Sequence, residues 1–289
     1  MSDPIVVGVD GSQSALTAVR WAAEEAARHR VPLALVHAYL VPERGYPDVV
    51  VSSGQVREAF EEQGRQWLET AAASVRDLVP DVRTSVVAAQ PAAAMIAASE
   101  GARLVVLGSR GLGGFLGLVV GSVAVAVATH GRSPLVVVRG PYPATGPVVL
   151  GVDGSPAGEA AIGQAFEAAS VRGAPLTALL AWTPLLAGTP YADKVRVHWA
   201  EVEEQQRQLL AQRLAGWQEE YPDVVVDRRV VRERATKALI DASRGAQLLV
   251  VGSRGRGGFA GLLLGSTSQA LVHHASCPLV VVRPDRSAD

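Results

Sequence analysis

This chain is built from two kinds of segment, which differ in how apolar and polar residues are arranged. Short, continuous apolar runs such as IVVGVD at 5–10 are typical of strands buried on both faces. Between such runs, apolar residues recur at helical spacing, as in 15–26, where Ser12 or Ser14 can cap the helix. Strands that alternate with helices predict a parallel sheet with helices on both faces.

The pattern predicts the same series of elements in each half of the chain. In the first half we expect strands at 5–10, 32–39, 82–88, 104–107 and 133–139, with helices after Ser12 and at about 56–78, 92–99 and 122–130. In the second half we expect strands at 149–153, 175–182, 224–231, 248–251 and 277–283, with helices at about 199–220, 236–243 and 266–274. The fold class is therefore α/β, with a five-stranded sheet in each half.

An internal repeat supports this division. VVGVDGSQSA (6–15) matches VLGVDGSPAG (149–158), RLVVLGSRG (103–111) matches QLLVVGSRG (247–255), and SPLVVVR (133–139) matches CPLVVVR (277–283). A period near 143 residues is too long for a solenoid and indicates a tandem duplication. We expect domains at 1–140 and 147–285, joined by the linker GPYPATG.

Composition restricts the partners and the compartment. The 289 residues are 48% hydrophobic and 19% charged, with a formal net charge of −1, so no nucleic-acid partner is expected. The single cysteine, Cys277, excludes an intrachain disulfide and fits a reducing cytoplasm. The first residues lack the basic segment of a signal peptide. The uncharged window 112–129 is broken by glycine, and its second copy carries Arg256, so we expect no membrane span.

A glycine-rich loop is the clearest candidate for chemistry. GSRGLGGFLGLVVGS (108–122) returns as GSRGRGGFAGLLLGS (252–266), with 11 of 15 positions identical. Each copy leaves the carboxyl end of a buried strand, where ligands bind in open α/β sheets, and ends at a helix N-terminus, which favours anions. Glycines let backbone N–H groups approach phosphate oxygens. The alternative is that they only permit a tight turn, but two near-identical copies favour a ligand.

The loop differs from two known phosphate motifs. No Gly-Lys-Ser/Thr closes it, so it is not a P-loop, and it follows the fourth strand rather than the first, unlike the dinucleotide fingerprint. Arg110 and Arg254 lie inside the loops and would either pair with phosphate or stay in solvent. No clear base or committed arginine finger accompanies either copy, so we assign no catalytic residue and no metal ligand.

With these residues, the chain resembles the universal stress protein family, in its tandem-domain form common in actinobacteria. Gly-x2-Gly-x9-Gly-Ser/Thr is that family's ATP-binding signature and stands here twice, and the GVDGS turns at 8–12 and 151–155 are also similar. The resemblance implies two Rossmann-like domains of the adenine nucleotide alpha hydrolase-like type. It further implies the strand order 3-2-1-4-5, with the nucleotide between strands one and four.

The resemblance also assigns site residues. It places Asp10 and Asp153 at the ribose or adenine, although an Asp-Gly turn with a helix cap is the alternative interpretation of Asp10. Ala38 and Ala181 would offer backbone atoms to adenine. The full implied set is Gly8, Asp10, Ala38, Gly108, Gly111, Gly121, Ser122 and Val123 in the first half, and Gly151, Asp153, Ala181, Gly252, Gly255, Gly265, Ser266 and Thr267 in the second.

The implied function is a cytoplasmic, nucleotide-dependent regulator of stress response or growth, with one ATP and its Mg²⁺ per domain. A slow ATPase or related nucleotide-using enzyme is the alternative, and a nucleotide-free interaction module is disfavoured because both glycine motifs are intact. The resemblance implies an intrachain pseudo-dimer through the fifth strands, and two chains could form a homodimer. Segments 41–53 and 184–197 differ between the halves and could act as lids, and Leu112 against Arg256 is a further difference.

Overall fold

The computed structural model describes residues 3–41, 53–111, 121–184, 198–255 and 264–284. Contacts divide the chain into two compact units, Met1–Pro141 and Tyr142–Asp289. Among the described residues, no helix has the length and apolar character needed to cross a membrane. Most of the two expected lids, and both Leu112 and Arg256, lie outside the described residues.

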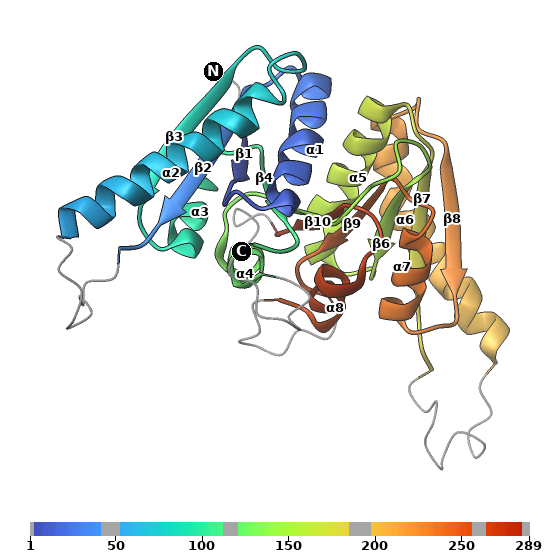
Figure 1. Ribbon diagram of the computed structural model, residues 1–289. Helices are drawn as coiled ribbons and strands as arrows, with labels where there is room; N and C mark the ends of the chain where they lie inside the picture. The colour runs from blue at the N-terminus through green and yellow to red at the C-terminus, as the bar shows by residue number, and fades with distance from the viewer. Residues whose placement is uncertain (1–2, 42–52, 112–120, 185–197, 256–263, 285–289) are drawn as a thin grey trace. The chain divides into compact units, whose positions relative to one another are not determined.

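The first unit is a parallel sheet with helices on both faces (Figure 1). Its elements are β1 (Ile5–Gly8), α1 (Gln13–His29), β2 (Leu33–Tyr39), α2 (Ser53–Ala73), β3 (Val82–Ala88), α3 (Pro91–Ala98), β4 (Leu104–Gly108), α4 (Ser122–His130) and β5 (Leu135–Val138). The strands lie in the order β3-β2-β1-β4-β5, and the neighbouring strands pair in parallel.

The second unit repeats this arrangement. Its elements are β6 (Val148–Val152), the short 3₁₀ helix η1 (Pro156–Gly158), α5 (Glu159–Arg172), β7 (Leu176–Ala181), α6 (Trp199–Glu220), β8 (Val226–Val231), α7 (Ala235–Ser243), β9 (Leu248–Gly252), α8 (Ser266–His274) and β10 (Leu279–Val282). Its strands lie in the parallel order β8-β7-β6-β9-β10. The predicted fold class and the order 3-2-1-4-5 are therefore confirmed in both units.

The apolar runs form the centre of each sheet. In β4 and β9, four consecutive residues of each strand (104–107 and 248–251) are buried, as expected for strands covered on both faces. Helix α1 packs on β4 through alanines, of which Ala18, Ala22 and Ala26 are completely buried. Small side chains let the helix approach the sheet closely, and this brings the first turn of α1 next to the end of β4.

Caps fix the ends of α1. Ser12, rather than Ser14, is the N-cap, and its Oγ accepts a hydrogen bond from the backbone N–H of Ala15 at 3.1 Å. At the other end Arg30 adopts a left-handed conformation, with φ 54°. Gly173 fills the same role for α5 with φ 57°, and glycine adopts this conformation without steric cost.

Helix α2 ends earlier than predicted. We predicted about 56–78, whereas the helix covers Ser53–Ala73 and is followed by turns. The Ser74 hydroxyl donates to the Ala71 carbonyl at 2.7 Å, a local bond that competes with helical pairing. Val75 and Val79 are nevertheless buried, so the apolar spacing of a helix continues past its end. That spacing is why the prediction was wrong there.

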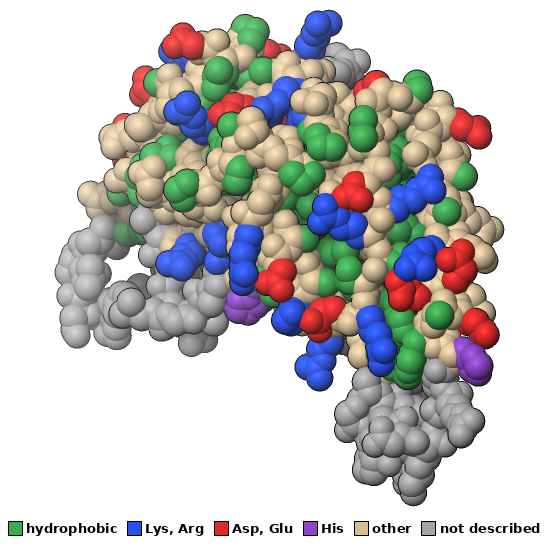
Figure 2. Space-filling model, turned by 90° about the vertical axis from the view of Figure 1, so that its right-hand side faces the viewer, with side chains coloured by type: hydrophobic (Ala, Val, Ile, Leu, Met, Phe, Trp, Pro, Cys, Tyr) green, Lys and Arg blue, Asp and Glu red, His purple; other side chains and the backbone are tan. Residues whose placement is uncertain are grey.

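Strands β3 and β8 end their sheets, since each pairs with a single neighbour. The middle residues of both strands are exposed and mostly polar or charged. Arg83 pairs with Asp81 at 2.7 Å, and Arg229 pairs with Asp227 at 2.7 Å. Figure 2 shows basic and acidic side chains interspersed over much of the side on which β8 lies. Charge on an edge strand opposes pairing with another chain.

Candidate nucleotide site

Each unit has a cavity at the carboxyl ends of its strands, the edge at which open α/β sheets bind ligands. The first cavity has a volume of about 850 Å³ and the second about 330 Å³. Both volumes lie within the usual range of ligand sites. The structure brings all eight residues predicted for each half to the cavity of their own unit. Contact between these residues and a nucleotide stays a prediction.

The predicted aspartates form turns at the cavity wall. Oδ1 of Asp10 accepts hydrogen bonds from the backbone N–H and the hydroxyl of Ser12, at 3.0 and 2.6 Å. Oδ1 of Asp153 accepts the same pair from Ser155, at 3.0 and 2.9 Å. The Asp-Gly turn with a helix cap is therefore present. Because the carboxylates also line the cavities, the turn and the ligand interpretation are compatible.

The first glycines of the loop are explained by packing within the protein. A Cβ on Gly108 would lie 2.6 Å from Oγ of Ser14 and 2.7 Å from its carbonyl oxygen. The backbone N–H of Arg110 donates to the same Oγ at 3.3 Å. A Cβ on Gly111 would collide with the Asp10 carboxylate. These contacts hold the loop against the first turn of α1 and leave no room for side chains.

The last glycine of the motif has a different environment. Gly121 is the N-cap of α4, with φ −69° and ψ 145°, which any residue can adopt, and no described atom lies within 4 Å of the position its Cβ would take. Gly265 occupies the same position before α8, and no side chain caps either helix. A Cβ on Gly265 would meet the Ser253 carbonyl oxygen at 3.4 Å, so only the Gly121 position is open. Both uncapped helix N-termini line their cavities, as a site for an anion requires.

Positive charge lies beside the first cavity. Arg110 lines the cavity, and Arg139 follows β5. Burial lowers the pKa of Arg139 below its usual value, and the positive charge of Arg110 lowers it further. An anion bound between the loop and α4 would reduce the repulsion between these two guanidinium groups.

Aromatic side chains form a wall of the first cavity that the sequence analysis missed. The buried His37 donates from Nδ1 to the Val9 carbonyl at 2.8 Å, and its ring meets Trp67 edge-on at 5.2 Å between centroids. Tyr39 stacks on Phe60 with centroids 5.8 Å apart. His37 and Tyr39 lie on β2, and the repeat does not mark Phe60 and Trp67 because α2 and α6 share little sequence.

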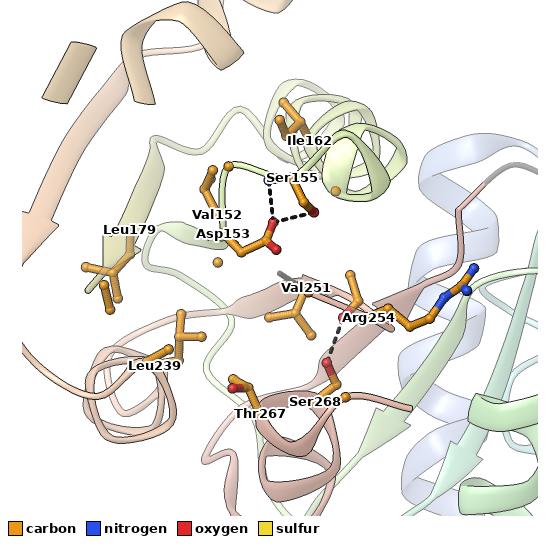
Figure 3. A pocket seen from close by; sticks show the side chains of 18 of the residues that line it. Val152, Asp153, Ser155, Ile162, Leu179, Leu239, Val251, Arg254, Thr267 and Ser268 are labelled. Carbon is orange, nitrogen blue, oxygen red and sulfur yellow. Dashed lines mark hydrogen bonds between the residues drawn. The ribbon is translucent and has the colours of Figure 1, made fainter. Parts of the chain in front are cut away.

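The second cavity has aliphatic walls. In Figure 3, the Asp153–Ser155 turn and the first turn of α8, with Thr267, lie on opposite sides, with Leu179 and Leu239 between them at one flank. The Arg254 side chain extends away from the other labelled residues. Walls of this kind hold a ligand mainly by shape, so specific contacts must come from the polar groups of the lining, which are the turn, the loop, the helix N-terminus and Arg213.

Other candidate groups lie outside the cavities. Trp217 packs on Phe166 and donates from Nε1 to Glu159 at 2.6 Å, so it serves the packing of α6 on α5. Cys277 is buried, and burial raises the pKa of its thiol to about 12, so it stays protonated and unreactive. Among the described residues, no group of three or more His, Cys, Asp or Glu side chains is arranged to hold a metal ion.

Comparisons with known proteins agree with this architecture. The model of the universal stress protein family matches residues 1–139 and again 145–283. A universal stress protein of Mycolicibacterium smegmatis is 42% identical over 295 residues, covering 97% of each chain, and one of Mycobacterium tuberculosis is 38% identical over 289 residues, covering 96% of each. The crystal structure of a universal stress protein from Archaeoglobus fulgidus has the same fold, with a TM-score of 0.71 at 17% identity over 98% of this chain and 99% of that one. Both halves of the sequence match, and the chain therefore belongs to the universal stress protein family.

Proposed function

We propose that each domain binds ATP in its cavity and that the protein acts as a nucleotide-dependent regulator of stress response or growth in the cytoplasm. One observation carries the proposal. In both domains a helix N-terminus that follows a glycine and has no side-chain cap faces a carboxylate turn across a cavity of ligand size. The helix N-terminus suits phosphate, and the carboxylate can accept hydrogen bonds from ribose hydroxyls.

The residues present fit this ligand. The backbone N–H groups at Ser122 and Val123, and at Ser266 and Thr267, would hold phosphate oxygens, with the serine hydroxyls as further donors. Asp10 and Asp153 would hold the sugar. Mg²⁺ would arrive with ATP and keep mostly phosphate and water ligands, because the described lining of each cavity offers one carboxylate.

A regulatory rather than catalytic role is favoured by what lines the cavities. The described lining residues include neither lysine nor glutamate. His37 has its Nδ1 committed to the Val9 carbonyl, which fixes the ring as part of the wall. No described group is placed to orient an attacking water and to stabilise a γ-phosphate together, so slow hydrolysis is the most that we expect.

The direct test is to purify the protein without added nucleotide, denature it, and identify any released small molecule by mass spectrometry. ATP at about two per chain, or titration of the emptied protein to that stoichiometry, supports the proposal. A protein that carries no nucleotide and gives no heat on titration with Mg-ATP contradicts it. Steady turnover lost in the Gly121→Ala/Gly265→Ala variant would instead favour the ATPase.

The association of the two domains through their fifth strands and of two chains into a homodimer stay predictions. Sedimentation velocity with and without ATP measures the second. Fractionation of the source cells tests the cytoplasmic location.

A further inference from the structure

The two cavities differ at one matching position on their long helices. Trp67 on α2 directly precedes Leu68, which is 2% exposed, and Arg213 on α6 directly precedes Leu214, which is completely buried. These leucines fix the register of the two helices. At this equivalent position the first domain has an indole and the second has a guanidinium group.

Contacts with the Asp-Gly turn show the same equivalence. A Cβ on Gly11 would meet the Trp67 ring, at 2.6 Å from Nε1. Nη2 of Arg213 donates to the Gly154 carbonyl at 3.0 Å. Gly11 and Gly154 are the same residue of the repeated GVDGS turn, and both Trp67 and Arg213 line their cavities. The exchange therefore lies within the two candidate sites.

The surroundings of each side chain reinforce the difference. Trp67 belongs to an aromatic wall with His37, Tyr39 and Phe60. The described lining of the second cavity contains no aromatic ring. The aromatic residues of that domain pack elsewhere, as Trp182 does against Trp199 beneath the guanidinium group of Arg232.

Arg213 also brings a charge that no described carboxylate neutralises. Within the described residues, its interaction is the bond to the neutral Gly154 carbonyl, and no Asp or Glu oxygen lies within 4.0 Å of its guanidinium nitrogens. A half-buried guanidinium with donors left over favours an anion, since charge-assisted hydrogen bonds are about twice as strong as neutral ones.

We propose that this exchange gives the two sites different selectivity. The first site recognises the aromatic base, through stacking against the wall that contains Trp67. The second recognises the negative charge of the phosphate chain, through Arg213 together with the N-terminus of α8. The inference rests on the proposed binding of nucleotide in both cavities and adds that only the first holds a nucleoside without phosphate.

Two probes separate these contributions in calorimetric titrations of the full chain freed of nucleotide. Adenosine carries the base without phosphate, and inorganic tripolyphosphate carries the phosphate chain without a base. We expect adenosine to bind one site per chain, weakened about tenfold or more by Trp67→Leu and unchanged by Arg213→Met. We expect the tightest tripolyphosphate site to weaken about tenfold or more in Arg213→Met, with recovery in Arg213→Lys and no change in Trp67→Leu.

Controls keep the result interpretable. Circular dichroism and the denaturation midpoint establish that each variant is folded, and Trp67→Phe keeps a ring if Trp67→Leu unfolds. Adenosine binding equally to both sites, or tripolyphosphate binding that ignores Arg213→Met, overturns the inference. ATP bound at two per chain with either of those results leaves the proposed function intact, whereas ATP bound at neither site removes both.

Discussion

Replacing Gly121 by alanine separates the needs of the fold from those of a ligand. The backbone at Gly121, with φ −69° and ψ 145°, is open to any residue, and no described atom lies within 4 Å of the new methyl group. The methyl would instead occupy the space in front of the first turn of α4, where the cavity begins.

The expected effect on stability is small. Alanine is a poorer N-cap than glycine by about 0.5–1 kcal/mol. Replacing glycine also lowers the conformational entropy of the unfolded chain, which stabilises the protein by about 0.4–1 kcal/mol. These contributions offset each other, so the free energy of unfolding should change by less than about 0.5 kcal/mol.

The expected effect on binding is large. A methyl group at residue 121 keeps a phosphate oxygen from the backbone N–H groups of Ser122 and Val123. Loss of one charge-assisted hydrogen bond costs about 1.5–3 kcal/mol, which raises Kd about 10- to 150-fold. One of the two sites per chain should therefore drop out of a calorimetric titration with Mg-ATP, while the second site at Gly265 keeps its affinity.

Two further alanine variants serve as controls. Gly216 lies exposed inside α6, and no described atom lies within 4 Å of its Cβ position, so Gly216→Ala should stabilise the protein by about 0.5–1 kcal/mol without changing ATP binding. Gly108→Ala forces its Cβ against Ser14 and should destabilise by about 1–3 kcal/mol. Full ATP affinity at both sites in a folded Gly121→Ala protein would refute the idea that this helix N-terminus holds phosphate.

Three other predictions follow from caps and from the buried thiol. Ser12→Ala should destabilise by about 1 kcal/mol more than Ser155→Ala in chemical denaturation, because only the Ser12 hydroxyl caps its helix, and equal losses would contradict this assignment. Arg30→Gly should stabilise the protein by about 0.5–1 kcal/mol, because the left-handed backbone at Arg30 is strained for a residue with a Cβ and Gly173 occupies the same position in the second domain. A loss of stability in chemical denaturation would show that the backbone at Arg30 is not strained. Burial raises the pKa of the Cys277 thiol from 9.0 to about 12, so as pH rises the unfolded chain loses this proton before the folded protein does. The thiol's contribution to stability is therefore fully present below about pH 9 and is lost between pH 9 and 12. Urea titrations across that range should show a shallower decline for Cys277→Ser, and parallel curves for the two proteins would exclude the thiol as the cause.

The fold was predictable because its signals are local and occur twice. Continuous apolar runs marked the strands and the repeat fixed which segments correspond, while the order 3-2-1-4-5 came from the family resemblance and is found in both domains. The end of α2 was not predictable, because Val75 and Val79 keep helical spacing in a segment that turns. Periodicity reports which side chains are buried, and burial does not require that the helix continue.

The candidate site was predictable where the backbone forms it and not where side chains do. The second glycine of the loop meets the carboxylate of the Asp-Gly turn in both domains, Gly111 against Asp10 and Gly255 against Asp153, so the two features constrain each other in both copies. Trp67 and Arg213 share a position without sharing a residue type, and the match is revealed by the buried leucines that follow them and by their contacts with the Asp-Gly turn. Aligning the two halves by identical residues does not mark a position at which the two sites carry different side chains.

The charged outer strands have a consequence for how copies of this protein can meet. Growth of a β-sheet from one molecule into the next needs a bare row of backbone groups, and at β3 and β8 that row is bordered by paired charges. A polymer built by strand addition would have to strip water from Arg83 and Asp81, or from Arg229 and Asp227, at each junction. Copies of this protein are therefore not expected to join through β3 or β8, and contacts between molecules must use other surfaces.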